Sequence, residues 1–367
     1  MRILLLGEYS NVHWTLAEGL RVLGHEVCVV SNGDFWKSYQ KDISLVRKST
    51  NKWDSAVFML KLLTVLPRLR NYDVVQIINP CFLEIKVEKN LTIYHYLKKY
   101  NKKVFLAGYG NDFYWVNACA NTDVFRYSDF KIWGIKRENS YTSGEIKDWI
   151  GSPKEFVNRE IAETCNGIVT GLYEYYVSYQ PYFKEKTTFI PFPINREKIE
   201  PILERKNNNG SVNFFIGIQK TRNEVKGTDI MYKALKEVKS NYPKLCNIVK
   251  VESVPFSEYQ QKMNQSDILL DQLYSYTPAM NGLLAMAKGL VLVGGGEEEN
   301  YEILGEKTLR PIINVLPNEK DVFDKLEMLI LEKNKIPELS RQSIEYIKKY
   351  HDHLKVAQQY LDFWDAH

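Results

Sequence analysis

Two short apolar runs, Arg2–Leu6 and Glu26–Ser31, flank a segment whose leucines recur at helical spacing up to Gly24. A succession of strand, helix and strand over this length predicts a βαβ unit, in which the two strands are parallel. This feature constrains the fold strongly, because a parallel sheet needs helices on both faces to bury its apolar strands.

Apolar runs that alternate with helical segments continue along the chain and form two series. In the first series the further runs are Val74–Ile78, Val104–Ala107, Ile168–Thr170 and Thr188–Pro191. The second series follows a proline-containing break at 191–195 and comprises Val212–Ile216, Ile248–Val251, Ile268–Asp271, Leu290–Val293 and Ile312–Val315. Such alternation is typical of a parallel sheet covered on both faces.

We therefore predict an α/β protein with two Rossmann-like, doubly wound parallel-sheet domains, residues 1–193 and 194–340, followed by a helical segment at 341–367. A length of 367 residues suits two domains that each bury a core. Ligands of doubly wound sheets bind at the carboxyl ends of the strands. We accordingly expect a ligand site in a central cleft where the two domains face each other.

The composition disfavours several classes of protein. Lys and Arg number 49 and Asp and Glu 45, and a net charge of +4 is too small for a dedicated nucleic-acid binder, so we expect no nucleic-acid partner. The five cysteines are odd in number and include no Cys-x-x-Cys, which favours neither a disulfide framework nor a zinc site. No apolar run approaches the ~18 residues of a membrane span, and the apolar start ends at Gly7, too early for a signal peptide. We expect a cytoplasmic protein.

The first loop, from Gly7 to the start of a helix near His13, is placed to bind an anion. The free N–H groups and the macrodipole of a helix N-terminus attract negative charge. The dinucleotide fingerprint Gly-x-Gly-x-x-Gly is absent from this loop, which disfavours an NAD enzyme. A plain tight turn explains Gly7 equally well, and a lone histidine such as His13 more often has a structural role.

The equivalent loop of the second series carries two cations, Arg222 and Lys226, just after a strand and just before a helix. An arginine binds phosphate oxygens with a planar fork and a lysine supplies a compact charge, so the pair suits a diphosphate. The alternative is an ordinary solvated loop, which would be the simpler interpretation of this loop taken alone.

Two later segments also follow strands. Thr277 before Pro278 predicts a helix N-cap, and the helix then carries Asn281 toward the cleft. The second segment is glycine-rich, at 294–296, and permits close backbone approach to a ligand. Carboxylates just beyond it can accept hydrogen bonds from sugar hydroxyls; they are Glu298, Glu299 and Glu302. A flexible turn followed by an acidic first helical turn explains this second segment equally well.

Taken in order, these segments resemble a known pattern. The chain is similar to the GT-B glycosyltransferases, and closest to the large retaining family that uses nucleotide-sugar donors, glycosyltransferase family four. The resemblance covers nearly the whole chain and is stronger in the second half. The matching segments are Gly7 with the strand before it, Gly24–Val27, Gly108–Asp112, Arg222 with Lys226 and Gly227, Ala285–Gly289, and the glycine-rich loop with its glutamates.

The resemblance implies a glycosyltransferase that uses a nucleotide diphosphate sugar and needs neither a metal ion nor another cofactor. It implies that the first domain binds the acceptor, that the second binds the donor, and that the terminal helix, 341–367, crosses back onto the first domain. The nucleotide base is expected near Val254 and Pro255. The donor diphosphate is expected to be held by Gly7, Arg222, Lys226, Thr277 and Asn281.

One departure from the family pattern concerns two glutamates, spaced Glu-x7-Glu, that touch the donor hexose and ribose. Their positions here are Tyr276 and Leu284. Either a later glutamate takes over one role, or the donor geometry differs, or activity is altered; we favour a diverged but active enzyme. Donor sugar and ribose contacts are then expected from Tyr276, Gly295, Gly296, Glu298, Glu299 and Glu302.

The expected chemistry places negative charge on the leaving nucleoside diphosphate, which cations and helix N-termini stabilise. The sequence contains no Asp-x-Asp metal motif, which is consistent with protein cations in place of a metal. Retention of configuration is implied only by the resemblance. An inverting enzyme would need a general base, for which His13 and Asp112 are candidates by position.

The acceptor is expected to be a saccharide or a lipid-linked saccharide. Residues 52–70 combine apolar and basic side chains, as in helices that lie on an anionic membrane; a core-packing helix with basic ends is a slightly better interpretation. Two other functions stay open: a GT-B sugar-nucleotide epimerase, and a nucleotide-sugar-binding relative that has lost catalysis.

Overall fold

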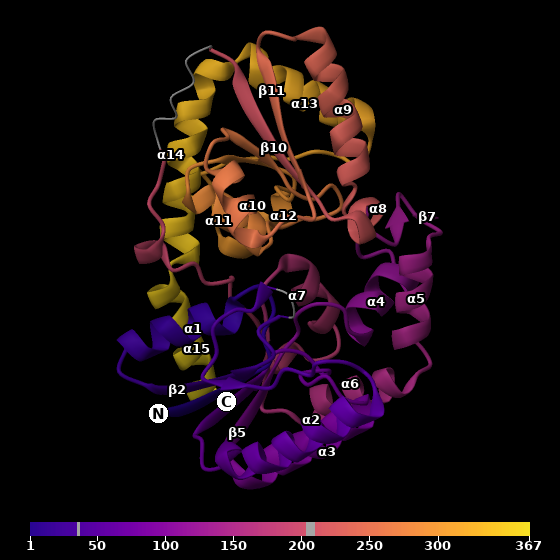
Figure 1. Ribbon diagram of the computed structural model, residues 1–367, viewed down its shortest axis with the longest axis vertical. Coiled ribbons are helices and arrows are strands. Elements are labelled where there is room, and N and C mark those ends of the chain that lie inside the picture. The colour runs from indigo at the N-terminus through magenta and orange to yellow at the C-terminus, as the bar shows by residue number, and fades with distance from the viewer. Residues whose placement is uncertain (35–36, 203–209) are drawn as a thin grey trace.

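The computed structural model describes residues 1–34, 37–202 and 210–367 and contains two stacked α/β domains (Figure 1). The first domain has a seven-stranded parallel sheet in the order β3-β2-β1-β4-β5-β8-β9. Its strands are β1 (Arg2–Leu6), β2 (Glu26–Ser31), β3 (Ile43–Ser44), β4 (Val74–Ile77), β5 (Lys103–Ala107), β8 (Gly167–Thr170) and β9 (Thr187–Phe189). The chain reverses its direction of travel at β1, which defines a crevice at the carboxyl ends of β1 and β4.

Helices cover both faces of this sheet and connect its strands. They are α1 (Val12–Val22), α2 (Lys52–Val65), α3 (Val87–Tyr100), α4 (Phe113–Asn121), α5 (Ser140–Trp149), α6 (Pro153–Thr164) and α7 (Tyr173–Tyr179). Between α4 and α5 lies an antiparallel hairpin of β6 (Lys131–Ile132) and β7 (Ile135–Lys136). We call residues 122–139, which contain this hairpin, the strap.

The second domain has a five-stranded parallel sheet in the order β11-β10-β12-β13-β14. Its strands are β10 (Val212–Ile218), β11 (Cys246–Glu252), β12 (Ile268–Leu270), β13 (Val291–Val293) and β14 (Ile312–Ile313). Its helices are α8 (Asn223–Lys226), α9 (Thr228–Asn241), α10 (Phe256–Met263), α11 (Met280–Ala287), α12 (Glu298–Leu304), α13 (Glu319–Leu331) and α14 (Ile336–Tyr346). Two parallel-sheet domains confirm the predicted fold class.

The C-terminal part of the chain is divided between the domains. Helix α14 packs on α11 and β13 of the second domain, so residues 341–346 of the segment expected at 341–367 stay with that domain. A π-helical turn at Ile347–His351 follows, and α15 (His353–Ala366) then packs on α1 and the first sheet. A Cβ at Gly19 would lie 2.4 Å from the His353 carbonyl oxygen, so glycine is required for the close contact between α1 and α15.

The two segments that cross between the domains lie side by side. The Ile194 N–H donates to the His351 carbonyl at 2.6 Å, and the His353 N–H donates to the Ile194 carbonyl at 3.2 Å. The Arg196 guanidinium pairs with Asp352 at 3.2 Å. A short two-stranded connection of this kind ties the domains together at one end of the cleft.

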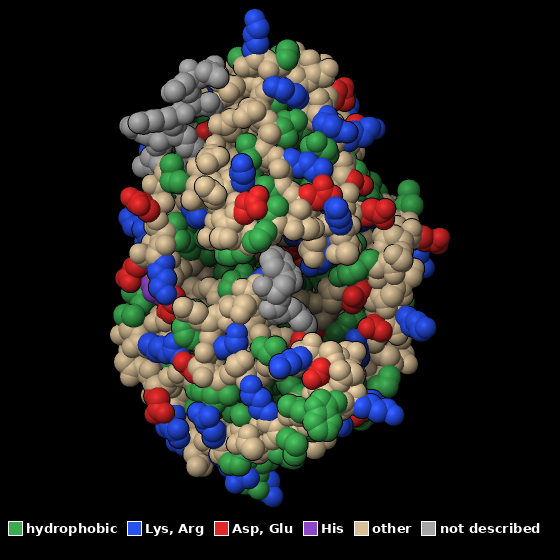
Figure 2. All heavy atoms as spheres, viewed as in Figure 1, with side chains coloured by type: hydrophobic (Ala, Val, Ile, Leu, Met, Phe, Trp, Pro, Cys, Tyr) green, Lys and Arg blue, Asp and Glu red, His purple; other side chains and the backbone are tan. Residues whose placement is uncertain are grey.

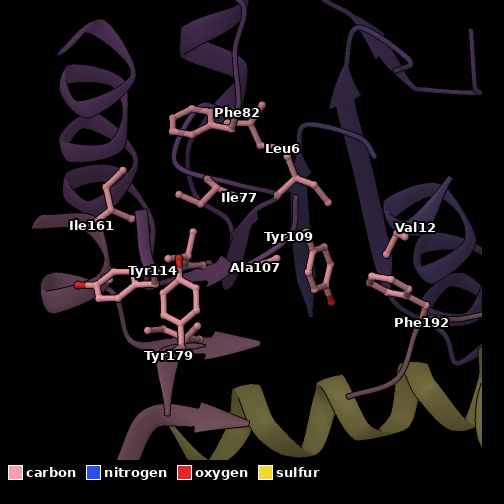
Figure 3. Close-up of a cluster of buried hydrophobic side chains, with 14 of the residues drawn as sticks. Leu6, Val12, Ile77, Phe82, Ala107, Tyr109, Tyr114, Ile161, Tyr179 and Phe192 are labelled. Carbon is pink, nitrogen blue, oxygen red and sulfur yellow. The ribbon is translucent and has the colours of Figure 1, made fainter. Parts of the chain in front are cut away.

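The core of the first domain is rich in tyrosine, and Figure 3 shows Tyr114 and Tyr179 side by side next to Ile161. Their ring centroids are 4.5 Å apart. Tyr109 packs edge-on against Phe192, at 5.0 Å, where the chain leaves the domain. This buried aromatic layer supports the loops that line the first-domain wall of the cleft.

Candidate active site

A cleft of about 1880 Å³ lies between the two domains, and its mouth opens on the face drawn in Figure 2. Loops at the carboxyl ends of strands from both sheets line it, as predicted for facing doubly wound domains. From the first domain these are the loops after β1, β2, β4 and β5, and from the second the loops after β10, β11 and β12.

Arg222 and Lys226 both line the cleft after β10: Arg222 is the N-cap of the short helix α8, and Lys226 is the last residue of that helix. Arg222 is exposed and Lys226 is half-buried. Burial lowers the pKa of Lys226; the nearby Asp271 carboxylate opposes this shift, whereas Arg222 and Lys37 reinforce it. Within the part of the chain that the structure describes, neither side chain forms an ion pair, although the Asp271 carboxylate acts on Lys226 from a longer distance and Asp129 does so on Arg222.

Asn281 also lines the cleft, in the first turn of α11, and its side chain is held in place. Its Nδ2 donates to Asp271 Oδ1 at 2.8 Å, and Asp271 directly follows β12. The Tyr259 hydroxyl also hydrogen-bonds to Asn281. The Asp271 carboxylate therefore links Asn281 electrostatically to Lys226, which places both groups on one wall.

Thr277 lines the cleft, but the predicted N-cap is wrong. Helix α11 begins at Met280 with Ala279 as its N-cap. The Thr277 hydroxyl donates instead to the carboxylate of Glu174, on α7 of the first domain. Its donor is thus occupied by an interdomain contact, because the helix begins only at Met280 and the segment ahead of it meets the other domain.

Three of the residues proposed for the site do not line the cleft: Gly7, His13 and Asp112. His13 is buried, with Nδ1 2.8 Å from the Gly7 carbonyl oxygen, and burial lowers the pKa of His13 to about 4. A Cβ at Gly7, where φ is +90°, would lie 2.3 Å from Ile78 Cγ2, so glycine is required for close packing of the sheet. Neither residue is exposed to a ligand in the cleft.

Asp112 is the N-cap of α4 and is also buried away from the cleft. It accepts from the Trp115 N–H at 2.8 Å and from the Tyr179 hydroxyl at 2.6 Å. Burial raises the pKa of Asp112 to about 6, although both hydrogen bonds oppose this shift. Asp112 stabilises a helix, and the structure places neither candidate general base, His13 or Asp112, at the cleft wall.

Tyr276 lies in the interface between the domains and does not line the cleft. Only 1% of it is exposed, and its ring packs on Tyr127 at 5.0 Å and Tyr173 at 5.8 Å, both from the first domain. Its hydroxyl accepts from the Arg126 N–H at 2.7 Å. The aromatic ring at this position thus joins the two domains, and its expected contact with a donor sugar is not supported.

The glutamates after the glycine-rich loop also make protein contacts. The Arg126 guanidinium pairs with Glu297 at 2.7 Å and with Glu299 at 3.1 Å. Glu298 pairs with Arg310 at 3.0 Å, and Glu302 is exposed on α12 outside the cleft lining. The acidic turn that was expected to meet sugar hydroxyls therefore binds the strap and its own domain.

The glycine-rich loop is used for packing. A Cβ at Gly295 would lie 2.9 Å from the Thr277 carbonyl oxygen, and one at Gly296 would lie 2.7 Å from Ile312 Cγ2. The Gly296 N–H donates to Asn314 Oδ1 at 3.2 Å. Neither glycine lines the cleft, because the loop folds against β14 and against the segment before α11.

The interdomain contacts of the strap and of Glu174, both in the first domain, were not predicted from the sequence. Besides Arg126, the strap supplies Arg137, which donates to the Glu224 carbonyl of α8 at 2.9 Å and covers the Tyr274 ring at 3.8 Å. Figure 1 shows the hairpin beside α8. These partners lie far apart in the sequence, so no local pattern could reveal them.

The cleft also contains an aromatic wall on α10. Phe256 and Tyr259 line it with ring planes 13° apart and centroids 6.4 Å apart, and Tyr39 of the first domain meets Phe256 edge-on at 6.3 Å. Val254 and Pro255, the expected neighbours of a nucleotide base, line the same wall. Flat apolar surface of this kind suits a stacked base.

The first-domain wall carries carboxylates and polar aromatic side chains. Asn111 Nδ2 donates to the Tyr141 hydroxyl at 2.6 Å, and the Arg222 guanidinium lies over the Tyr141 ring at 5.8 Å. Asp129 of the strap lines the same wall. Burial raises the pKa of Asp129 to about 6, and Arg137 and Arg222 oppose the shift.

Two absences among the described residues concern metal binding and membrane crossing. No group of three or more His, Cys, Asp or Glu side chains there is arranged to hold a metal ion. No helix in the same ranges has the length and apolar character that a membrane crossing requires.

No family model matches this sequence, and no curated protein matches it. Its fold, in contrast, is similar to several solved structures. HepE of Anabaena, solved with UDP and glucose, has a TM-score of 0.60 at 10% identity, with 100% of each chain covered. Sucrose-phosphate synthase of Thermosynechococcus elongatus has a TM-score of 0.62 at 11% identity, with 100% of this chain and 98% of that chain covered.

A protein of Listeria monocytogenes assigned as a UDP-N-acetylglucosamine 2-epimerase is also similar, with a TM-score of 0.54 at 11% identity over 98% of this chain and 94% of that chain. Likenesses at these identities show the fold. The chain has the GT-B fold, as the resemblance implied, with both domains and the terminal helix included in the match.

Proposed function

We propose that the protein is a glycosyltransferase that moves a sugar from a nucleotide diphosphate sugar to a saccharide or lipid-linked acceptor. The observation that carries this proposal is the pair of cations at the end of β10, Arg222 and Lys226, which face a deep interdomain cleft without ion-pair partners among the described residues. A diphosphate would supply the missing negative charge.

These two cations also account for the proposed chemistry. Negative charge develops on the leaving diphosphate as the glycosidic bond breaks, and preorganised cations stabilise it. Lys226 is half-buried, where its charge interacts more strongly than in water. We propose that they replace a resident metal ion and that configuration is retained; the anomeric signals of the product in an NMR spectrum test retention.

The donor is proposed to lie along the second domain. Its base would pack on the aromatic wall near Phe256 and Tyr259, its diphosphate on Arg222 and Lys226, and its sugar toward Asn281. The acceptor would enter from the first-domain wall. HepE was solved with UDP, and the Listeria protein is named for a UDP-sugar substrate. Uridine nucleotides are therefore the first donors to test.

An epimerase would bind the same donor, and so would an inactive relative. Tyr276 and Leu284, which stand in place of the two glutamates, are consistent with an inactive relative. The three are separated by the fate of the nucleotide. A transferase releases nucleoside diphosphate only when its acceptor is added, and an epimerase interconverts the sugar without an acceptor. An inactive relative binds the donor but neither releases nucleoside diphosphate nor converts the sugar. We favour the transferase, because both walls of the cleft carry polar groups suited to two substrates.

The experiment that tests the donor site is a thermal-shift screen of UDP, ADP, GDP and dTDP and of their sugar conjugates. A bound ligand raises the free energy of unfolding by RT ln(1 + [L]/Kd), and the melting temperature rises with it. We expect Lys226→Ala to abolish the shift of the best diphosphate. Lys233→Ala, which removes an exposed lysine paired with Glu319 in the same domain, should leave it unchanged. An undiminished shift in Lys226→Ala contradicts the proposed donor site.

We further propose a cytoplasmic enzyme of surface polysaccharide or glycan biosynthesis that contacts an anionic membrane surface through residues 52–70. Helix α2 buries Phe58, Leu62 and Val65 but leaves Trp53 78% and Leu60 65% exposed. The five cysteines are unpaired thiols, which suits a reducing compartment.

A further inference from the structure

Glu174, near the start of α7 in the first domain, makes an unusual contact with the second domain. Its side chain is 4% exposed and lines the cleft. Oε1 accepts from the Tyr276 N–H at 2.6 Å and from the Thr277 N–H at 3.1 Å, and the other carboxylate oxygen accepts from the Thr277 hydroxyl. Three donors of the second domain thus converge on one carboxylate of the first.

This contact is costly to break. Burial raises the pKa of Glu174, and the hydrogen bonds from Thr277 and Tyr276 oppose the shift by stabilising the charged form. If the domains separated, two N–H groups, the Thr277 hydroxyl and the carboxylate would all lose their partners together. Leaving a buried donor or acceptor unpaired costs about 1–3 kcal/mol, and more for a charged group.

The contact also fixes the segment that lines the donor wall. Tyr276 and Thr277 lie just ahead of α11, whose first turn carries Asn281 and its hydrogen bond to Asp271. In contrast, the groups proposed to hold the nucleotide, Arg222 and Lys226, belong entirely to the second domain. Nucleotide binding and domain closure therefore depend on different residues.

We propose that Glu174 is a positioning residue that holds the two domains in the closed, transfer-competent arrangement by binding the backbone ahead of α11. This inference rests on the proposed function, since it assigns Glu174 to the step in which the first-domain acceptor wall meets the donor. It acts through its hydrogen bonds to Tyr276 and Thr277, and the proposal assigns it no contact with the nucleotide.

The test compares Glu174→Ala with Glu174→Gln in the full chain. In Glu174→Ala we expect kcat to fall about 10- to 100-fold, while the Kd of the best of UDP, ADP, GDP and dTDP stays within about twofold of the wild-type value. Glu174→Gln should restore kcat to within about threefold, because the amide oxygen can accept from both N–H groups and the amide nitrogen can donate to the Thr277 hydroxyl. Glu163→Gln, which alters an exposed carboxylate of the first domain, serves as the matched control.

Hydrogen exchange of the peptide containing residues 273–280 gives a readout that needs no substrate. Faster exchange of the Tyr276 and Thr277 amides in Glu174→Ala, with Glu174→Gln close to wild type, supports the proposal even if the chain transfers no sugar. Unchanged exchange or unchanged kcat in Glu174→Ala overturns it, as does a parallel loss of nucleotide binding. Failure of the proposed function is seen separately, as a wild-type chain that binds none of the four nucleotides.

Discussion

Lys226 and Asp129 face the same cleft from opposite domains, and the surroundings of each favour its uncharged form. Burial lowers the pKa of Lys226 and raises the pKa of Asp129 to about 6. Neither side chain forms an ion pair among the described residues that would offset this effect. Such shifts are common where a ligand supplies the missing interactions, and they make these two residues informative targets.

The effect of Asp129 on stability has a definite sign. Its pKa in the folded chain, about 6, lies above its usual value of 3.8, so folding favours the protonated carboxyl. The stabilising contribution of the protonated form is complete below pH ~4 and is lost as the pH rises through 6. At pH 8 we expect the free energy of unfolding of Asp129→Asn to exceed that of the wild type by up to about 3 kcal/mol. The variant should therefore unfold at a higher temperature. The difference should disappear near pH 4, which calorimetry at both pH values checks; a constant difference contradicts the assigned pKa.

Helix α2 has both a face that packs into the core and an exposed apolar face with basic neighbours, which are the two roles considered for residues 52–70. Phe58, Leu62 and Val65 pack into the first-domain core, as expected of a core helix, while Trp53, Val57, Leu60 and Leu63 stay exposed. Four basic residues on this helix or close to it in the sequence are also exposed: Lys48, Lys52, Lys61 and Arg68. Figure 2 shows hydrophobic and basic side chains over the part of the surface where Figure 1 draws α2.

If this face meets a membrane, it should prefer anionic lipid. We expect the double variant Trp53→Ser with Leu60→Ser to bind vesicles containing phosphatidylserine at least tenfold more weakly than the wild type, because each side chain loses apolar burial of about 1.5–3 kcal/mol. The melting temperature should change little, since both side chains are exposed. Leu331→Ser removes a comparably exposed leucine from the second domain and should have no effect in the flotation assay. Equal binding of the wild type to neutral vesicles would count against the proposal.

At the scale of the whole molecule, the domains are joined at both ends of the cleft. The crossing segments at Ile194 and Asp352 form one connection, and the strap forms the other through Arg126 and Arg137. Two residues expected to touch the donor, Tyr276 and Glu299, take part in this second connection. Glu297 and Glu299, in the acidic turn after the glycine-rich loop, thus help to determine how the two domains sit relative to each other.

The contribution of the strap's Arg126–Glu297 ion pair to the free energy of unfolding can be measured. Arg126 is partly exposed and Glu297 is mostly buried, and their charged groups are 2.7 Å apart. We expect a double-mutant cycle of Arg126→Ala and Glu297→Gln to give a coupling of about 1 kcal/mol in urea unfolding, above that of most exposed pairs. The exposed pair Lys320 and Asp324 on α13 is the reference and should couple by less than about 0.5 kcal/mol. Equal couplings would show that the strap adds nothing beyond an ordinary surface contact.

Much of the fold could be predicted from the sequence because its causes are local. Apolar runs such as Arg2–Leu6 and Val212–Ile218 form buried parallel strands, and the intervening helical periodicity places the loops at the sheet edges. Arg222 and Lys226 line the cleft for the same reason, since they directly follow a strand. Position relative to a strand end was sufficient information for these two residues.

The roles of Tyr276, Thr277 and the glutamates could not be predicted in this way. Each was assigned by its place after a strand, yet each makes its main contact with the other domain or with its own domain's surface. His13 and Asp112 likewise turn inward, because the backbone groups of Gly7 and α4 need their polar atoms. Loop position restricts where a residue lies but not which way its side chain points.

The sequence by itself determined the two parallel sheets, their helices and the strand-end location of the cations, because hydrophobic periodicity and turn residues act within a few positions. The tertiary structure alone decided which polar groups face the cleft. Glu174 meets Thr277, and Arg126 meets Glu297, across more than a hundred residues of chain. Such pairings arise only when separately folded domains pack, since a hydrogen bond requires that its two groups meet in space and is indifferent to their separation in sequence.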